Sequence, residues 1–524
     1  MIPPLARSAR ADRLWALAAV LPFVAISLWY WDYIPIWDAR EYADCIAGAA
    51  RKGHFPRDYV CAGHPTLVYA LFSSALVSLL PAPQVAILIV HVAFGVVTLL
   101  SFRALGRGLF PGHDRELTLL TGVLGVFPIL LGATVSVSPD CAVAAFFLAF
   151  LACLARGRFW SAALCGLLLV FSKETGCLLL VMAVGLHALI FVTRGAGTLA
   201  DKERALKAYL PTLLPLLAFA GWIAWSRRAG TAAFWGNRSS GSLLELFTSF
   251  SLLEKQFVGH LMAICVFQFL WLVTGAAAVR WISKLKGALL GLPSKDPTSL
   301  RWLDAMFFAA LFLLTRYRAY VNLRYYLALF PLLLLCGYAA IAGLPRLVRV
   351  IAIGALGVLF AVSSFRTVDP VARFVVGTFD LGKRPLLMMT QLGDDCCGYG
   401  RDQLVYNLEH TEFHYLQDEL YPTLRPSAER PLAGPLDADY LFIGRLDRQS
   451  WRRTMRQDGT VSPRLLMMSD FKAGNRPAEL SWMRLPNFDL AEQEKQLLEW
   501  YQPQGRQTFT HGAYALEVVT YRLR

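Results

Sequence analysis

The sequence is poor in charged residues for its length. Asp, Glu, Lys and Arg make up 17% of its 524 residues, whereas soluble domains typically carry about 25%. Hydrophobic residues make up 56%, and the mean hydropathy is +0.46. This composition excludes an ordinary soluble enzyme and is typical of a protein that crosses a membrane many times.

Acidic residues are scarce in the first two thirds of the chain. Residues 1–365 hold 31 Lys and Arg against 16 Asp and Glu, whereas residues 366–524 hold 20 against 21. Positive charge confined to an apolar region does not indicate nucleic-acid binding. It is typical of loops that lie at membrane faces near anionic lipid.

The ten cysteines lack the paired CxxC spacing of metal sites. Six lie in apolar runs, and we interpret them as inert core residues. Cys45 and Cys61 share a polar loop, and Cys396 and Cys397 are adjacent in the tail. A Cys45–Cys61 bridge would form if the loop faces an oxidising compartment. The sequence leaves free thiols open as the alternative.

The N-terminus lacks the cleavage site of a signal peptide. Three arginines within residues 7–13 precede the charge-free run 14–31, but no small-x-small site follows. An aromatic belt at residues 29–33 follows instead, as is found where a retained helix leaves the bilayer. We therefore expect a membrane anchor. The sequence also shows no long low-complexity segment and no clear internal repeat.

Long apolar runs are the dominant pattern. A helix needs about 20 mostly apolar residues to span a membrane. We therefore expect a polytopic α-helical membrane protein with about 11 transmembrane helices and with interfacial helices on its outer face. The candidate spans are 14–31, 84–102, 117–136, 141–155, 159–173, 175–193, 208–226, 256–279, 303–316, 325–344 and 349–365.

The run 66–83 decides the topology. It is short and is interrupted by serines and prolines, which favours an interfacial helix over a span. With this run at the surface, 19 Lys and Arg face one side of the membrane and 12 face the other. The positive-inside rule then places the N-terminus in the cytosol. We predict a multi-pass protein of a bacterial inner membrane.

Two domains are expected. Residues 1–365 form a transmembrane domain whose first outer loop is 32–83, and residues 366–524 form a domain on the outer, periplasmic face. The tail is long enough for its own core and reads as a small α/β or α+β domain. Expected strands are Leu386–Thr390, Tyr440–Ile443 and Leu516–Tyr521, and expected helices are Asp418–Leu420 and Leu490–Trp500.

Acidic residues occur in two of the predicted outer turns. Asp38 and Glu41 are three residues apart, so they share a face if the segment is helical, and Tyr42 follows them. Asp140 begins the fourth span. Acids at helix starts are often only capping or solvated residues. Acids that meet at a membrane surface are also candidates for catalysis.

Histidine and lysine mark two further outer turns. His64 precedes Pro65 where the interfacial helix opens, although a lone histidine is usually structural. Lys173 and Glu174 interrupt two apolar runs. Lysine in lipid costs about 2.5–3.5 kcal/mol on insertion scales, so we expect Lys173 to be paired or to face a polar cavity. The alternative is a Lys173–Glu174 tip at the surface.

Three arginines flank the outer turn between the ninth and tenth spans. Arg316 and Arg318 precede the turn, and Arg324 and Tyr325 follow it. Guanidinium groups hold phosphate through paired, charge-assisted hydrogen bonds. The alternative is contact with lipid headgroups by snorkelling side chains.

Together these segments resemble polyprenyl-phosphate-dependent glycosyltransferases of the GT-C type, the group that includes protein O-mannosyltransferases and the lipid A aminoarabinose transferase. Five landmarks within about residues 10–360 follow the order of the group. They are similar to its acidic first-loop motif, its Lys/His-Pro-Pro-Leu helix start, its second acidic loop, its Gly-Leu-x-x-Thr-Lys segment and its Arg-Tyr-Leu-Pro-Leu-Leu span. The corresponding segments are Trp37–Ala43, His64–Leu67, Ser138–Asp140, Leu167–Gly176 and Arg324–Leu335.

Two residues depart from this pattern. The acidic pair of the group is adjacent, whereas Ala39 follows Asp38 here and the glutamate is Glu41. Thr66 stands in place of the second proline of the helix start. Asp38 is therefore the better match for the first acidic position.

The resemblance implies an inverting transfer of a sugar from a polyprenyl-phosphate donor to a glycan, lipid or protein acceptor at the outer membrane face. Asp38 would act as the base, and Asp38 and Asp140 would be the ligands if Mg²⁺ or Mn²⁺ takes part. Implied catalytic residues are Asp38, Asp140 and Glu41; implied phosphate ligands are Lys173, Arg324, Arg316, Arg318 and His64; further pocket residues are Tyr42, Glu174 and Tyr325.

Two other classes of protein remain open from the sequence. A transporter or lipid flippase also combines many spans with buried charge, although it usually shows repeats and a site at the membrane midplane. A receptor-like scaffold with an outer sensing domain would not require Asp38, Lys173 and Arg324 to converge.

Overall fold

The structure is a computed structural model, and the chain divides into two compact units. The first comprises Met1–Trp31 and Glu41–Gly393, and the second comprises Asp32–Arg40 and Asp394–Arg524. The domain boundary at residue 365 stays a prediction. The structure describes residues 9–29, 42, 46, 50, 60–61, 64–65, 67–80, 83–135, 139–195, 198–228, 255–292, 296–317, 323–365 and 369–371, together with the strands 440–446, 451–457, 464–467, 501–511 and 514–523.

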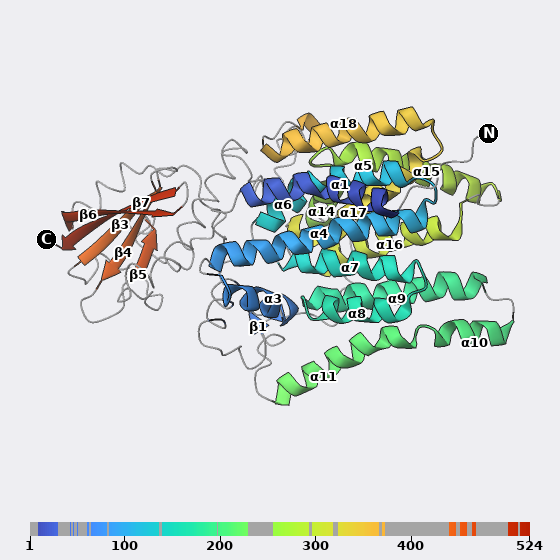
Figure 1. Ribbon diagram of the computed structural model, residues 1–524, viewed down its shortest axis with the longest axis horizontal. Coiled ribbons are helices and arrows are strands. Elements are labelled where there is room, and N and C mark those ends of the chain that lie inside the picture. The colour runs from blue at the N-terminus through green and yellow to red at the C-terminus, as the bar shows by residue number, and fades with distance from the viewer. Residues whose placement is uncertain are drawn as a thin grey trace. The chain divides into compact units, whose positions relative to one another are not determined.

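The first unit is a helical bundle in which most helices run along one common direction (Figure 1). Its described elements are α1 (Ala9–Trp29), β1 (Val60–Cys61), β2 (His64–Pro65), α3 (Leu67–Val77), α4 (Pro83–Leu109), α5 (Asp114–Gly125), α6 (Pro128–Val135), α7 (Asp140–Leu154), α8 (Phe159–Val170), α9 (Glu174–Gly195), α10 (Leu199–Lys207), η1 (Leu210–Leu213), α11 (Leu214–Arg228), α14 (Lys255–Cys265), α15 (Leu270–Leu289), α16 (Thr298–Tyr317), η2 (Leu323–Tyr326), α17 (Leu329–Ile341) and α18 (Arg346–Phe365).

Helices that follow one another through short turns reverse direction, so their termini gather at two ends of the bundle. One end contains the start of α7, the α8–α9 turn and η2, and we call it the site end. The far end contains the α4–α5, α7–α8 and α15–α16 turns. At about 1.5 Å per residue, α7 alone separates the two ends by roughly 22 Å.

The helices agree in position with the predicted spans. Four of them are long and apolar enough to cross a membrane, and two bent pairs raise that number to six. Further apolar helices of 10–17 residues occupy the positions of the other predicted spans. These features are those of a multi-pass membrane protein. The total of about eleven spans stays a prediction.

The run 117–136 is not the single straight span that we expected. It divides into α5 and α6, which meet at 52°. Pro128 begins α6. Proline has no N–H to donate, and its ring disfavours the helical conformation at the residue before it. The position of Pro128 therefore explains this bend.

The run 256–279 is also broken, between α14 and α15, with an angle of 97°. Gln268 and Phe269 at the break have φ values of 58° and 61°, a left-handed conformation that costs non-glycine residues about 1–2 kcal/mol each. The buried carboxylate of Asp369 accepts hydrogen bonds from the Phe269 N–H at 2.8 Å and the Trp271 indole N–H at 3.3 Å. These contacts stabilise the bend.

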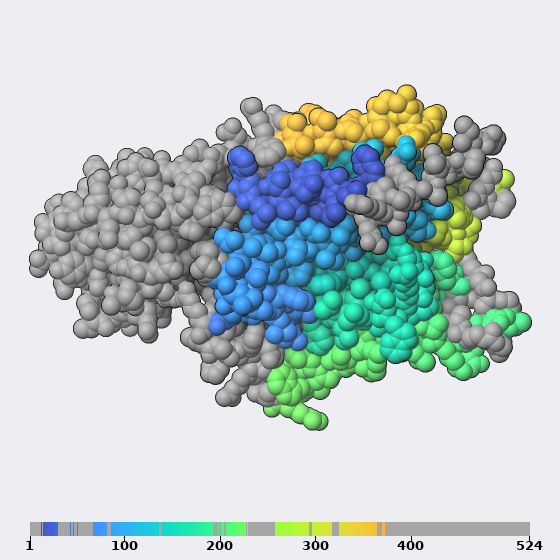
Figure 2. Space-filling model, in the orientation of Figure 1, coloured from blue at the N-terminus to red at the C-terminus, as the bar shows by residue number. Residues whose placement is uncertain are grey.

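The outer surface of the bundle is apolar along several helices. Figure 2 shows α18 and α1 on one face, above α4. The exposed side chains include Leu17 and Leu21 on α1 and Ile351 and Val358 on α18, each at least 59% exposed. Exposed apolar surface of this extent is expected where lipid surrounds a protein.

Buried polar contacts tie the helices together at the far end. Asp12 on α1 pairs with Arg103 and Arg107 of α4, and Arg349 of α18 donates to Glu116 of α5 at 2.7 Å. These ion pairs connect helices that are distant in sequence.

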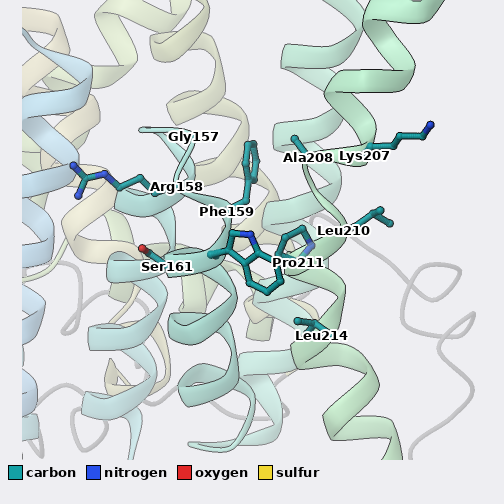
Figure 3. A pocket seen from close by; sticks show the side chains of 10 residues that line it. Gly157, Arg158, Phe159, Ser161, Lys207, Ala208, Leu210, Pro211 and Leu214 are labelled. Atoms are coloured by element: carbon teal, nitrogen blue, oxygen red, sulfur yellow. The ribbon is translucent and has the colours of Figure 1, made fainter.

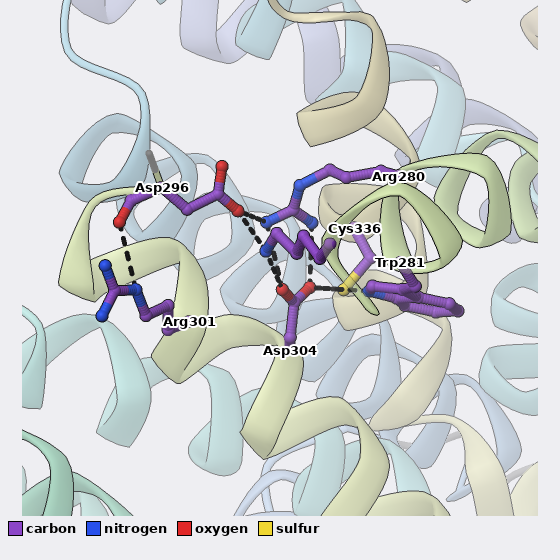
Figure 4. Close-up of polar contacts among 7 residues, drawn as sticks. Arg280, Trp281, Asp296, Arg301, Asp304 and Cys336 are labelled. Atoms are coloured by element: carbon purple, nitrogen blue, oxygen red, sulfur yellow. Dashed lines mark hydrogen bonds and ion pairs between the residues drawn. The ribbon is translucent and has the colours of Figure 1, made fainter. Parts of the chain in front are cut away.

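The largest of these ion networks joins α15 to α16 (Figure 4). Arg280 donates to Asp304 at 2.9 Å and to Asp296 at 2.8 Å, and Lys284 donates to Asp304 at 2.6 Å. The predicted spans ended at residue 279 and resumed at residue 303, whereas α15 continues to Leu289 and α16 begins at Thr298.

The second unit contains a five-stranded antiparallel sheet in the order β5-β4-β3-β7-β6. The expected strands Tyr440–Ile443 and Leu516–Tyr521 lie inside β3 and β7. The expected strand Leu386–Thr390 and both expected helices lie outside the described residues, so the α/β or α+β class stays a prediction. The strands are β3 (Tyr440–Leu446), β4 (Trp451–Gln457), β5 (Arg464–Met467), β6 (Tyr501–His511) and β7 (Tyr514–Leu523).

Candidate functional site

Asp140 is the first residue of α7 and lies at the site end of the bundle. Pro139 precedes it as the N-cap residue. Because a proline ring disfavours the helical conformation at the residue before it, Pro139 favours a helix start at this position. A carboxylate in the first turn is stabilised by the partial positive charge of the helix N-terminus. Asp140 is nevertheless only 5% exposed, and such a buried charge requires further partners.

Lys173 lies in the turn between α8 and α9. The Ser172 hydroxyl donates to the Leu168 carbonyl at 2.6 Å, and the Gly176 N–H donates to the Lys173 carbonyl at 2.9 Å. A Cβ on Gly176 would lie 2.2 Å from the Leu169 carbonyl oxygen. The close approach of the two helix ends therefore requires glycine at this position.

The ammonium group of Lys173 contacts both oxygens of Asp140, at 2.9 and 3.0 Å. Arg324 of η2 approaches the same carboxylate, with Nε 3.9 Å from Oδ2. Lys173 is 1% exposed and Arg324 is 8% exposed. Lys173 is therefore buried and paired, as its position in an apolar run required. The alternative of a Lys173–Glu174 tip at the surface is wrong.

Tyr325 forms an aromatic wall beside the two cations. The Lys173 ammonium lies 4.9 Å from the centre of its ring, and the Arg324 guanidinium carbon lies 5.3 Å from it. Cations in such positions are attracted to the ring face. We call Asp140, Lys173, Arg324 and Tyr325 the Asp140 cluster.

Neighbouring residues support η2 from α14 and α16. The hydroxyl of Tyr326 is hydrogen-bonded to the His260 ring of α14, and both side chains are buried. Arg316 lies in the last turn of α16, and α16 packs beside η2. Sequence reasoning did not select His260 or Tyr326. The available signal was a histidine inside the apolar run 256–279.

Within the Asp140 cluster, two cations share one carboxylate. Glu174 begins α9 directly after Lys173 and is 5% exposed. Arg318 lies outside the described residues, whereas its neighbour Arg316 is only partly exposed. Asp140, Lys173 and Arg324 thus meet, whereas the predicted convergence of Asp38 with Lys173 and Arg324 concerns a residue outside the described part of the chain and stays a prediction.

The first outer loop reaches the same end of the bundle. Tyr42 is 1% exposed, and its ring packs edge-on against Tyr69 of α3 with a centroid distance of 5.8 Å. The neighbouring Val68 N–H donates to the Phe171 carbonyl at 3.1 Å, two residues before Lys173. Tyr42 therefore lies near the α8–α9 turn.

The remaining first-loop residues are only partly described. Asp38 and Glu41 lie outside the described residues, although Glu41 directly precedes Tyr42 in the chain. The backbone of His64 belongs to β2, which pairs with β1, and its side chain lies outside the described part.

Asp140 does not fit the role of a metal ligand in this arrangement. Both of its oxygens accept hydrogen bonds from Lys173, whose charge repels a cation. Among the described residues, no group of three or more His, Cys, Asp or Glu side chains has the geometry of a metal site. The proposed second ligand, Asp38, lies outside the described residues.

Comparison with known proteins gives similarity to solved structures only, since no family model and no curated sequence matches the chain. ArnT from Cupriavidus metallidurans bound to undecaprenyl phosphate is 15% identical over 80% of this chain and 83% of that chain, with a TM-score of 0.48. The apo form of that protein is 16% identical with a TM-score of 0.47, over the same shares. The apo oligosaccharyltransferase from Archaeoglobus fulgidus is 12% identical over 81% of this chain and 62% of that chain, with a TM-score of 0.42.

The identities are 12 to 16% and all three TM-scores are below 0.5, so the resemblance to the glycosyltransferase group stays a prediction from the sequence motifs.

Proposed function

We propose that the chain is a membrane glycosyltransferase that moves a sugar from a polyprenyl phosphate to a hydroxyl or amine of an acceptor at the outer face of the membrane. The observation that carries the proposal is the convergence of two buried cations, Lys173 and Arg324, on the single carboxylate of Asp140. The acceptor is a glycan, a lipid or a protein.

The Asp140 cluster suits a phosphate at the membrane interface. Lys173 and Arg324 are held by Asp140 and by the Tyr325 ring before any ligand arrives. Donors that are positioned in advance, in a site with little water, stabilise developing negative charge more strongly than mobile ones do. Asp140 thus acts as a positioning residue, and Arg316 and Arg318 assist from the adjoining turn.

The reaction breaks the bond between the anomeric carbon of the sugar and a phosphate oxygen. The bonding electron pair stays on that oxygen, and negative charge grows on the polyprenyl phosphate as it leaves. Lys173 and Arg324 stabilise this charge. The acceptor attacks the anomeric carbon from the opposite side and forms the new bond, so the anomeric configuration inverts.

The acceptor loses a proton during the attack, and Asp38 is the proposed base. Asp38 precedes Tyr42 by four residues in the chain, and Tyr42 packs beside α3 near Lys173. Glu41 and His64 belong to the same predicted outer loop. The site end then faces the outside of a bacterial inner membrane, and the far end, with its basic helix termini, faces the cytosol.

Replacement of Asp38 tests the mechanism. The Asp38→Asn variant is expected to bind undecaprenyl phosphate as the unchanged protein does but to lose transfer at least about 100-fold, since general bases contribute that much or more. The assay follows release of undecaprenyl phosphate from a panel of labelled undecaprenyl-phosphate sugars. Asp58→Asn in the same loop is the matched control. Full turnover by Asp38→Asn contradicts the assignment of the base.

A lipid flippase is the second candidate, because the 97° break between α14 and α15 resembles the interrupted helices of transporters. Reconstituted vesicles separate the two functions. A flippase moves a fluorescent polyprenyl-phosphate sugar between leaflets with its sugar still attached, whereas the proposed enzyme transfers the sugar to an acceptor.

A further inference from the structure

A hollow lies at the far end of the bundle, one helix length from the Asp140 cluster. It has a volume of about 680 Å³ and lies between the start of α8 and the segment α10–η1–α11. Figure 3 shows Arg158 and Lys207 on opposite sides of the hollow, with Phe159 and Pro211 between them and with both charged groups directed outward. The proposed transferase reaction uses none of these residues.

The two cations at the rim are available to an anionic ligand. Arg158 is exposed, and its guanidinium makes no hydrogen bond or ion pair within the described part of the chain. Lys207 pairs with Glu203 one turn earlier at 2.7 Å, but both side chains are more than 60% exposed. Exposed pairs of this kind are worth little, about 0.3–0.5 kcal/mol. The pair does not prevent Lys207 from binding a phosphate.

The start of α8 adds backbone donors on the same side. Arg158 is the N-cap residue, and no side chain caps the helix. The Ala162 N–H, which donates to the Arg158 carbonyl at 2.9 Å, is the first that points back into the helix. The preceding N–H groups therefore point toward the turn, where helix N-termini favour anions. Gly157, with φ of +66°, leaves open space beside them.

Below the rim the walls of the hollow are apolar. Trp160 is 73% exposed and Leu210 is 59% exposed, and Leu214 lies deeper along α11. Exposed apolar side chains continue along both helices away from the rim, through Leu164 of α8 and Leu217 of α11. This order of cations, then an aromatic ring, then aliphatic side chains complements the phosphate, the interfacial region and the acyl chains of a phospholipid.

We infer that this hollow binds one phospholipid with an anionic headgroup from the leaflet at the far end. Its phosphate lies at the start of α8, the exposed side chains of Arg158 and Lys207 turn inward to contact it, and its acyl chains lie along α8 and α11. A soluble anion would leave the apolar walls exposed. A bound lipid joins the α10–α11 segment to the rest of the bundle, so its loss loosens that segment.

Lipid competition in nanodiscs tests this inference. Purified protein is placed in dioleoyl phosphatidylcholine with increasing dioleoyl phosphatidylglycerol, and bound phosphatidylglycerol is counted by native mass spectrometry. Arg158→Gln is expected to weaken retention of one phosphatidylglycerol about fivefold, the effect of one cation at a membrane surface. Glu203→Gln is expected to strengthen retention, because it releases Lys207. Lys286→Gln, an exposed far-end lysine outside the hollow, is expected to change nothing.

Three results overturn the inference. The first is equal retention of phosphatidylcholine and phosphatidylglycerol by the unchanged protein. The second is an equal loss in Arg158→Gln and Lys286→Gln, which indicates general surface charge. The third is displacement of the lipid by millimolar glycerol 3-phosphate, which indicates a site for a soluble phosphate. All variants are first compared in phosphatidylcholine alone, where unchanged melting temperatures show that they fold.

Discussion

Asp140 is the residue on which the candidate site depends. Its carboxylate holds Lys173 at 2.9 Å and faces Arg324 at 3.9 Å, and all three side chains are buried. A buried ion pair is weak evidence for stability, because burying both charges costs as much as their attraction returns. We therefore interpret the pair as a means of holding cations in place for a ligand.

The Asp140→Asn variant is expected to lose about 3–5 kcal/mol of unfolding free energy, because it leaves Lys173 buried beside a neutral partner. Thermal unfolding in detergent measures this effect. Glu203→Gln, which removes only an exposed surface ion pair with Lys207 at the far end, is the control. Adding Lys173→Met to Asp140→Asn should restore part of the loss, and a double variant less stable than Asp140→Asn contradicts the pairing.

Gly176→Ala is expected to separate the ends of α8 and α9, because the added Cβ would lie 2.2 Å from the Leu169 carbonyl oxygen. Lys173 then moves relative to Asp140, so both the melting temperature and the affinity for undecaprenyl phosphate should fall. Gly185→Ala lies on the same helix with open space around its Cβ and should be neutral. Equal behaviour of the two alanine variants contradicts the steric argument.

The sequence predicted that Lys173 is buried, but it did not identify the ion-pair partner of Lys173. A lysine inside an apolar run must be paired, so burial was predictable from position alone. Asp140 and Arg324 come from other turns, and no local spacing connects them to Lys173. Their convergence was proposed from the side of the membrane on which each turn lies, and the distances required the folded chain.

At the scale of elements, the α14–α15 bend depends on one distant carboxylate. Asp369→Ala removes the acceptor of the Phe269 N–H and the Trp271 indole N–H. Leaving such donors buried without an acceptor costs about 1–3 kcal/mol each. Hydrogen exchange should then speed up over residues 266–272, which measures loosening at the bend. Unchanged exchange there contradicts a role for Asp369 in the bend.

The contact of α1 with α4 should depend on pH through Asp12, which precedes the apolar part of α1. The hydrogen bond from Arg103 is the largest cause that lowers the Asp12 pKa; burial opposes it, and the charges of Arg103 and Arg107 add to it. A carboxyl with a lowered pKa stabilises the fold above its unfolded pKa, about 3.9, and loses that contribution as the pH falls through its folded pKa.

The unchanged protein should therefore melt at a higher temperature than Asp12→Asn at pH 7, with the difference shrinking below about pH 4. Hydrogen bonds to charged groups of this kind contribute about 1.5–3 kcal/mol. Thermal melts of both proteins from pH 3 to pH 7 provide the measurement. A difference that grows on acidification contradicts the assignment.

The sequence contains a local signal for one of the two helix bends but not for the other. Pro128 lies inside the run 117–136 and could have predicted the α5–α6 break. The run 256–279 has no proline at its break, where Gln268 and Phe269 adopt left-handed conformations beside Asp369. Its geometry is set by a contact about 100 residues away in the chain, so local patterns could not predict it.

For the whole molecule, the apolar runs placed most of the described helices of the first unit, but not α10, whose sequence is polar. The order of those runs also predicted which turns share an end, because successive spans alternate in direction. The second unit was less predictable. Two strand positions were correct, but the antiparallel order of the sheet arises from pairings between strands such as β3 and β7, which are distant in sequence.

Cations share carboxylates at both ends of the first unit, but the two ends differ in burial. At the far end, Asp12 is 23% exposed and Lys284 is 26% exposed. At the site end, the side chains of Asp140, Lys173 and Arg324 are each less than 10% exposed. Cations held in place where little water reaches are suited to bind an anion, and this binding is the central claim of the proposed function.

The most direct test compares the affinities of undecaprenyl phosphate and undecaprenol, which differ only in the phosphate. The unchanged protein should bind the phosphate form at least about tenfold more tightly, as charge-assisted hydrogen bonds to two cations imply. Arg324→Ala should remove most of this preference, whereas Lys286→Ala at the far end should preserve it. Equal affinity for the two lipids, or an unchanged preference in Arg324→Ala, would contradict the claim that these cations hold a donor phosphate.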